Sequence, residues 1–107
     1  MELYIRPDID FESRQRIMHG FTESVMGVVV KEWRVKRMKT RWGSCNIRDK
    51  RVWINLQLAK KSPEYLEYIV VHEMTHLLEK SYNNRFKGFM DKFEPDWRRL
   101  KDELNKN

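Results

Sequence analysis

The order of apolar and polar residues along the chain predicts a short strand, a helix, two further strands and then three helices. Residues 2–6 are consistent with the first strand. From Phe11 to Met26 apolar residues recur at helical spacing, and Gly27 is the expected end of that helix. The stretch from Val28 to Thr40 is rich in β-branched residues, which favours a strand, and a change of phase in its alternation indicates a bulge.

A third, half-buried strand is predicted after a loop. Residues Arg41 to Lys50 are typical of the loop, and from Arg51 to Leu58 every second residue is apolar. We expect this strand to pair back across the loop with the strand before it. A small sheet therefore precedes the helical half of the chain.

The next helix is the most strongly marked element. Ser62, Pro63 and Glu64 provide the cap, the first-turn proline and the early acid that are typical of a helix start. The helical pattern continues to Leu78. Apolar residues lie on almost every side of this helix, so we expect it at the centre of the fold.

Two more helices complete the pattern. Asn83 or Asn84 caps a helix that extends to Phe93, and Pro95 opens another that ends near Leu104. The predicted fold class is α+β, with a small sheet, a backing helix, a central helix and C-terminal helices.

Length and composition favour one globular domain over residues 1–107, since the 107-residue chain is 40% hydrophobic and 36% charged. No apolar run is long enough for a membrane span. Cys45 is the single cysteine, which suits a reducing compartment, and we expect the cytoplasm. The net charge of +6 would attract acidic peptides or, weakly, nucleic acid.

The segment HEMTH, from His72 to His76, carries the chemistry. Two histidines four residues apart on a helix differ by about 40° around its axis, so both imidazoles can reach one metal ion. Glu73 lies about 100° from His72, off the metal but close to a metal-bound water, where it can act as general base. The pattern predicts a Zn²⁺ site that lowers the pKa of its water and polarises a carbonyl.

A catalytic zinc normally has three protein ligands, and the candidates for the third are Tyr82, Glu79 and Glu94. Tyr82 ranks first because it is ten residues after His72, the offset of the third histidine in the extended motif HExxHxxGxxH. Glu79 is about 10.5 Å along the helix from His72 and suits a supporting role better. Glu94 lies at a helix junction, where it is either a ligand or a cap. His19 falls on the first predicted helix, away from the motif.

With these residues in view, the sequence resembles the YgjP-like family of metal-dependent hydrolases and the related minigluzincin peptidases. The resemblance covers roughly residues 33–104 and rests on four segments: MKTRWGSCN at 38–46, VWINLQLAKKSPEYLEYIVVHEMTHLLE at 52–79, NNRF at 83–86 and PDW at 95–97. It implies a minimal zincin fold, whose cleft has an edge strand that can pair with an extended peptide. It also implies zinc and the hydrolysis of a peptide or protein substrate.

The resemblance has one departure and one further implication. The family completes its metal site with a histidine, and alignment on NNRF places that position at Tyr82. Tyrosine binds zinc only through its oxygen, so the alternatives are weaker affinity, another acid as ligand, or lost catalysis. Minigluzincins also resemble zymogens whose C-terminal segment occludes the cleft, which implies an inhibitory role for residues 94–107.

The RWGSCN segment is most simply structural. Gly43 is expected to permit a tight turn, Trp42 to fill the core, and Cys45 to be a small buried residue rather than a nucleophile, because no base can be assigned to it.

Two other functions remain open. A nucleotide pyrophosphatase would bind phosphates with the basic cluster Lys36, Arg37, Lys39 and Arg41. A non-enzymatic nucleic-acid or protein binding module would use cations from Lys31 to Arg41 and Arg48 to Arg51, together with Trp33, Trp42 and Trp53. Acids such as Glu32 and Asp49 interrupt those cations, so a solvated face is the simpler interpretation.

Overall fold

The computed structural model describes residues 22–106. The strand expected at 2–6, His19 and most of the first predicted helix lie outside these residues. Residues 22–26 are helical, and Gly27 ends the helix as predicted. Gly27 adopts a φ of 73°, and its N–H donates to Glu23 O at 2.9 Å, a conformation that glycine takes without a steric penalty.

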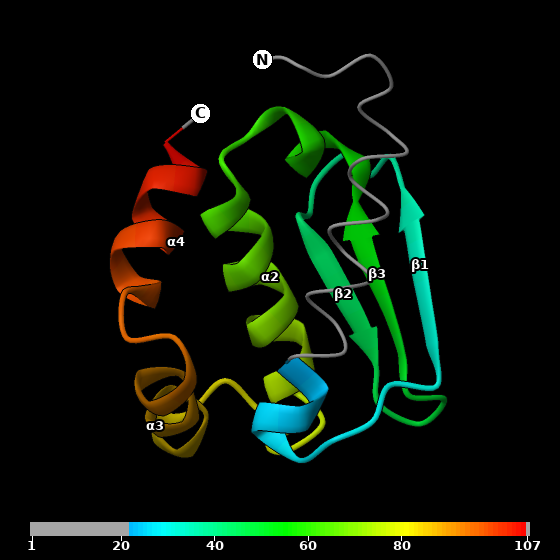
Figure 1. Cartoon of the computed structure of the whole chain (residues 1–107), viewed down its shortest axis with the longest axis vertical. Coiled ribbons are helices and arrows are strands. Elements are labelled where there is room, and N and C mark those ends of the chain that lie inside the picture. The colour runs from blue at the N-terminus through cyan, green and yellow to red at the C-terminus, as the bar shows by residue number, and fades with distance from the viewer. Residues whose placement is uncertain (1–21, 107) are drawn as a thin grey trace.

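Three strands form a mixed sheet in the order β1-β3-β2 (Figure 1). They are β1 (Glu32–Lys36), β2 (Gly43–Asn46) and β3 (Arg51–Asn55). β3 pairs with β1 in parallel and with β2 antiparallel. The sheet therefore confirms the predicted strand at Arg51 but differs from the prediction in three respects.

First, the expected loop at 41–50 contains β2, which forms a hairpin with β3 around the turn at residues 47–50. Second, the pairing of β3 with β1 is parallel, because the chain has already reversed once through β2. Third, β1 ends at Lys36 instead of continuing through a bulge. The prediction missed β2 because this strand is four residues long and lacks apolar alternation.

β3 ends earlier than predicted because Asn55 turns the chain into a 3₁₀ helix, η1 (Leu56–Lys60). The Asn55 side chain accepts from Gln57 N at 2.9 Å, which caps η1. The predicted alternation of buried and partly exposed residues is confirmed up to Asn55, since Val52 and Ile54 are fully buried.

The motif lies on α2 (Pro63–Thr75), with Pro63 in the first turn as predicted. The expected cap Ser62 makes no side-chain capping bond. Residues 76–78 continue α2 as a tight turn, because Leu77 N and Leu78 N bond three residues back to Met74 O and Thr75 O at 2.9 Å. α2 is the central helix, as predicted, since it packs on the sheet and on both later helices.

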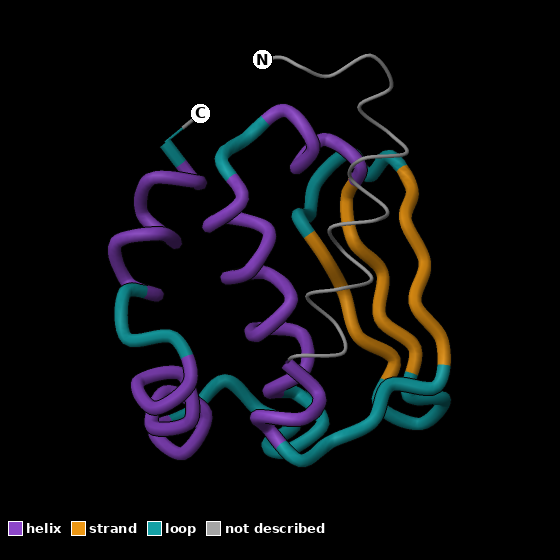
Figure 2. Tube along the Cα trace, viewed as in Figure 1, coloured by secondary structure: helices purple, strands orange, loops and turns teal. Residues whose placement is uncertain are grey.

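Those helices are α3 (Asn84–Phe93) and α4 (Trp97–Asn105), which lie on the side of α2 opposite the sheet (Figure 2). Asn83 caps α3, as predicted, by accepting from Phe86 N at 3.0 Å. Buried residues of all three layers make one core: Val52, Ile54, Leu66, Val70, Met74, Phe86, Met90, Leu100 and Leu104. No helix in the described part of the chain is long and apolar enough to cross a membrane.

Candidate metal centre and active site

His72 and His76 lie side by side at the C-terminal end of α2. Their ring centroids are 5.2 Å apart, and both rings contact Phe86, at 5.1 and 4.7 Å. Phe86 is fully buried and comes from α3, so a second helix fixes the orientation of both imidazoles. The helical spacing thus brings the two rings together as the sequence predicts.

The surroundings of the two histidines suit metal binding. Burial, the charge of His76 and the charge of Lys101 lower the pKa of His72 to about 4, so its ring is neutral at pH 7. Within residues 22–106 its buried Nδ1 has no hydrogen-bond partner. His76 Nδ1 lies 3.1 Å from Lys80 O, and the tautomer that donates this bond leaves a free lone pair on Nε2.

Glu73 lies beside them and is only 6% exposed. Burial raises the pKa of its carboxyl to about 8, and the charge of Arg41 partly opposes that shift. A carboxyl whose pKa lies near neutrality can both take up and return a proton, as a general base and acid must. A bound cation would add to the effect of Arg41 and favour the carboxylate.

A pocket of about 340 Å³ joins these side chains to the edge of the sheet. It is lined by His72, Glu73 and His76 from the motif and by Arg41, Gly43, Ser44, Cys45, Ile47 and Lys80. Among residues 22–106, β2 pairs only with β3. The motif therefore faces a terminal strand across one pocket.

Gly43 lets β2 approach α2 closely, which is a different role from the tight turn that we predicted. A Cβ at this position would lie 2.8 Å from Ile69 Cγ2, 3.0 Å from Trp53 O and 3.1 Å from Glu73 Cγ. Ordinary carbon contacts are longer than these distances, so only glycine fits without displacement. The sequence signalled Gly43 but could not show what it faces.

Cys45 is half-buried in the same pocket. Burial and the charge of Glu73 raise the pKa of its thiol to about 11, so it is protonated at neutral pH. This supports the prediction that Cys45 is not a nucleophile. Arg41, which we had considered only for phosphate binding, is a lining residue that the motif analysis missed.

Tyr82 lies near the histidines, although it lines the adjacent pocket. Its ring centroid is 6.3 Å from that of His72, and the residue is 45% exposed. Lys101 Nζ donates to its hydroxyl at 3.3 Å, which turns that oxygen towards α4. The structure thus brings Tyr82 beside His72 but not into the pocket that contains Glu73.

The two alternative acids have other partners. Glu79 accepts from Ser81 N at 3.2 Å and lies 3.8 Å from Arg85. Glu94 is 8% exposed and shares a hydrogen bond with Glu67, on the N-terminal half of α2. Burial and this neighbour raise the pKa of Glu94 to about 8.

These donors meet the chemical needs of a zinc ion in part. Among residues 22–106 no three or more His, Cys, Asp or Glu side chains are arranged so that together they could hold a metal ion. Two imidazoles with adjacent rings nevertheless provide two zinc ligands of the usual kind, and the phenol ring of Tyr82 lies 6.3 Å from that of His72. The residues fit a site that is completed by tyrosine or by a molecule from outside the chain.

Comparison with known proteins identifies the family of this chain. Residues 11–107 match the sequence model of the YgjP-like metallopeptidase domain. The chain belongs to the YgjP-like family. No curated protein sequence matches this YgjP-like chain significantly.

Two solved structures share the fold of this YgjP-like domain. The metallopeptidase zymogen abylysin of Pyrococcus abyssi has a TM-score of 0.75 at 15% identity, over 84% of this chain and 90% of its own. The metallopeptidase zymogen jannalysin of Methanocaldococcus jannaschii has a TM-score of 0.71 at 18% identity, over 84% and 92%. The minimal α+β fold that the sequence predicted is confirmed.

The structure separates two of the tryptophans expected for nucleic-acid binding. Trp33 and Trp53 project to opposite faces of the sheet. Trp33 shares a face with its partner Val52, and Trp53, the next residue after Val52 in β3, points to the other face. Lys36 lies over the Trp53 ring at 4.3 Å. Glu32 bonds to both Arg34 and Arg51. These tryptophans and cations therefore do not form one stacking surface, and the comparisons give nucleic-acid binding no support.

Proposed function

We propose that this YgjP-like domain is a zinc-dependent peptidase that hydrolyses extended peptide segments. The observation that carries the proposal is the pocket where His72, Glu73 and His76 face β2, a terminal strand of the sheet. A terminal strand can pair with a peptide through its backbone and so present one bond to the side chains below it. Cys45, the single cysteine, carries a free thiol, and we propose a cytoplasmic location on this basis.

In this proposal His72 and His76 hold the metal, and each has a distinct support. Phe86 packs against both rings, and Lys80 O accepts from His76 Nδ1. When bound, zinc would supply an acidified water and a Lewis acid for the substrate carbonyl. The protein's own contribution is to keep the His72 imidazole neutral and to hold the two rings side by side.

Glu73 acts as the general base. Its carboxylate takes a proton from water and later gives it to the amine that leaves the peptide bond. The burial of Glu73 keeps this proton from bulk solvent, and Arg41 contributes positive charge that favours the carboxylate form. Arg41 also lies where a substrate carbonyl or carboxylate would approach along β2.

We propose Tyr82 as the third metal ligand of this chain. Its ring is already beside that of His72, and Lys101 donates to its hydroxyl, so positive charge lies next to the oxygen that would bind the metal. A rotation of the side chain from Lys101 towards His72 would be needed. Metal content of the Tyr82→Phe variant tests this role, with loss of zinc expected and unchanged zinc as the contrary result.

The peptidase itself is tested by cleavage of a denatured protein substrate with and without zinc. We expect cleavage by the zinc-loaded protein and a loss of at least about a hundredfold in Glu73→Gln, with zinc still bound, because general base catalysis contributes at least that factor. Glu79→Gln is the matched control, since Glu79 bonds to Ser81 and Arg85 instead. Equal activity of the wild type and Glu73→Gln would refute the assignment.

We also propose that the C-terminal segment lowers the activity of the enzyme without abolishing it, since both structural neighbours are zymogens. Trp97, Leu100 and Leu104 of α4 are buried in the core, so removal of the whole segment would unfold the protein. Release is therefore tested with urea below the unfolding midpoint. This inhibition predicts that activity rises there before it falls, whereas a steady decline would contradict it.

A further inference from the structure

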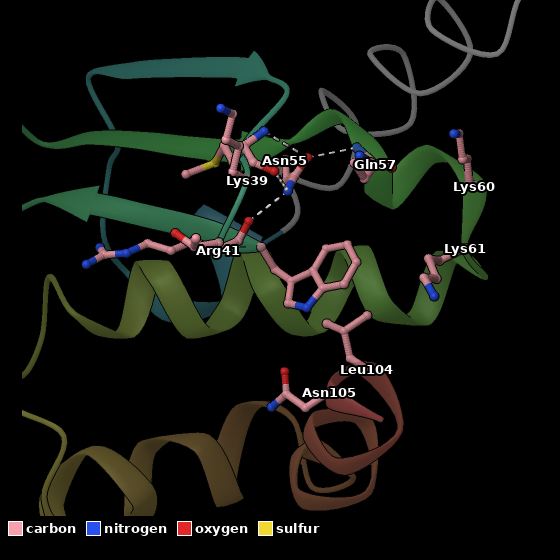
Figure 3. Close-up of a pocket in the computed structure, with 11 residues that line it drawn as sticks. Lys39, Arg41, Asn55, Gln57, Lys60, Lys61, Leu104 and Asn105 are labelled. Carbon is pink, nitrogen blue, oxygen red and sulfur yellow. Dashed lines mark hydrogen bonds between the residues drawn. The ribbon is translucent and has the colours of Figure 1, made fainter. Parts of the chain in front are cut away.

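A second, larger pocket of about 550 Å³ lies beside the candidate active site (Figure 3). Its wall consists of the loop between β1 and β2, the η1 segment and the end of α4. The lining residues are Met38, Lys39, Thr40, Arg41, Trp42, Asn55, Gln57, Lys60, Lys61, Leu104 and Asn105. Apart from Arg41, none of these residues takes part in the proposed chemistry of the motif.

The pocket wall is held in place by one buried side chain. Asn55 is 3% exposed, and its amide nitrogen donates to Met38 O at 3.0 Å and Arg41 O at 2.7 Å. Its amide oxygen accepts from Met38 N at 3.3 Å and Gln57 N at 2.9 Å. Figure 3 shows these bonds joining the loop to η1. A fixed wall lowers the entropy that a ligand must remove on binding.

The lining charges all have one sign. Lys39, Arg41, Lys60 and Lys61 are cationic, and none of the described lining residues is an acid. Glu103, the acid that directly precedes Leu104 in α4, accepts from Tyr65 and Arg99 and is therefore engaged elsewhere. Such a concentration of positive charge without counter-charges attracts an anionic group.

Arg41 connects this pocket to the active site. It lines both pockets, and in Figure 3 its side chain extends away from Lys60 and Lys61. The same chain continues into β2 at Gly43, which lies against Glu73. Because an extended chain advances about 3.3 Å per residue, Lys39 is at most about 13 Å, or four peptide residues, from Gly43.

We infer that the pocket lined by Lys39, Lys60 and Lys61 binds a carboxylate of the peptide substrate, and so selects peptides with an acid roughly three to five residues from the cleaved bond. The inference rests on the proposed peptidase function. A peptide antiparallel to β2 would present its C-terminal side to this pocket, and a parallel one its N-terminal side. The carboxylate would come from an acidic side chain or from the end of the peptide.

The test measures binding without cleavage. Fluorescent ten-residue peptides with amidated ends carry one Glu, scanned through every position of a neutral sequence, and bind to the Glu73→Gln protein in an anisotropy titration. One unamidated neutral peptide tests the terminal carboxylate. The double variant Lys60→Gln, Lys61→Gln is compared with Lys31→Gln, Lys92→Gln, which removes the same charge from exposed positions outside the pocket.

We expect one or two Glu positions, or the free carboxyl end, to bind roughly three- to tenfold more tightly than the neutral amidated peptide at low salt. The preference should disappear in the pocket variant and persist in the control. An equal loss in both variants, no positional preference or no binding of any peptide would overturn the inference. Failure of the peptidase proposal would instead show as absence of cleavage, which this measurement does not require.

Discussion

Asn55 is the residue whose replacement tests the described fold most directly. Its side chain makes four hydrogen bonds, three to the loop before β2 and one to Gln57 in η1. Its backbone N–H donates to Trp42 O at 3.0 Å. The substitution Asn55→Ala removes the four side-chain bonds and keeps the backbone bond. The loop before β2 and the start of η1 then lose their common anchor.

The expected cost follows from these bonds. A buried hydrogen bond contributes about 0.5–1.5 kcal/mol net, so four bonds would give about 2–6 kcal/mol. Met38 and Arg41 lie close to solvent, and water can replace the bonds to their backbone, which places the expected loss at about 2–3 kcal/mol. For a domain of this size that loss lowers the melting temperature by about 10 °C.

The assay is urea unfolding followed by circular dichroism, with thermal unfolding as a second measure. Asn46→Ala is the matched control, because Asn46 also ends a strand but is exposed, and in the described part of the chain its side chain bonds only to Asp49, at 3.0 and 3.3 Å. We expect the control to lose less than about 1 kcal/mol. A cost below about 0.5 kcal/mol for Asn55→Ala would refute the account of Asn55 as the anchor of the loop.

Two further predictions concern packing and pH. Gly43→Ala should reduce the free energy of unfolding in urea by about 1–3 kcal/mol, because the new methyl group displaces Ile69 and Glu73. The same displacement should reduce cleavage more than zinc binding. Normal cleavage activity would show that the contact at Gly43 is not tight. The pKa of Glu94 is raised from 4.5 to about 8, so its contribution to stability is full below pH 4.5 and is lost as the pH rises to 8, by at most about 1.4 kcal/mol per pH unit. Urea unfolding of Glu94→Gln should accordingly match the wild type at pH 4.5 and show higher stability at pH 9, and an equal difference at both values would exclude this cause.

Local signals in the sequence were sufficient for the helices. Pro63, the cap at Asn83 and the stop at Gly27 act within one helical turn, so each could be interpreted without knowledge of the rest of the fold. The same is true of His72 and His76, whose relation depends only on the helical repeat. The predictions succeeded where the relevant partners are close in sequence.

Partners distant in sequence account for the failures. β2 exists because Gly43–Asn46 pairs with β3, and nothing within those four residues signals a strand. The end of β3 at Asn55 likewise depends on bonds to the preceding loop. The position of Tyr82 between His72 and Lys101 depends on the packing of α4, which no spacing rule provides.

The terminal position of β2 has a consequence beyond substrate binding. Unpaired backbone groups on a terminal strand accept any extended chain, including the same strand of another molecule, and so create a risk of aggregation. β2 is only four residues long, and its neighbours Arg41 and Arg48 carry like charges that would meet in a paired dimer. A short strand between two arginines can bind a peptide for cleavage, while the same arginines make two copies of the protein repel each other in solution.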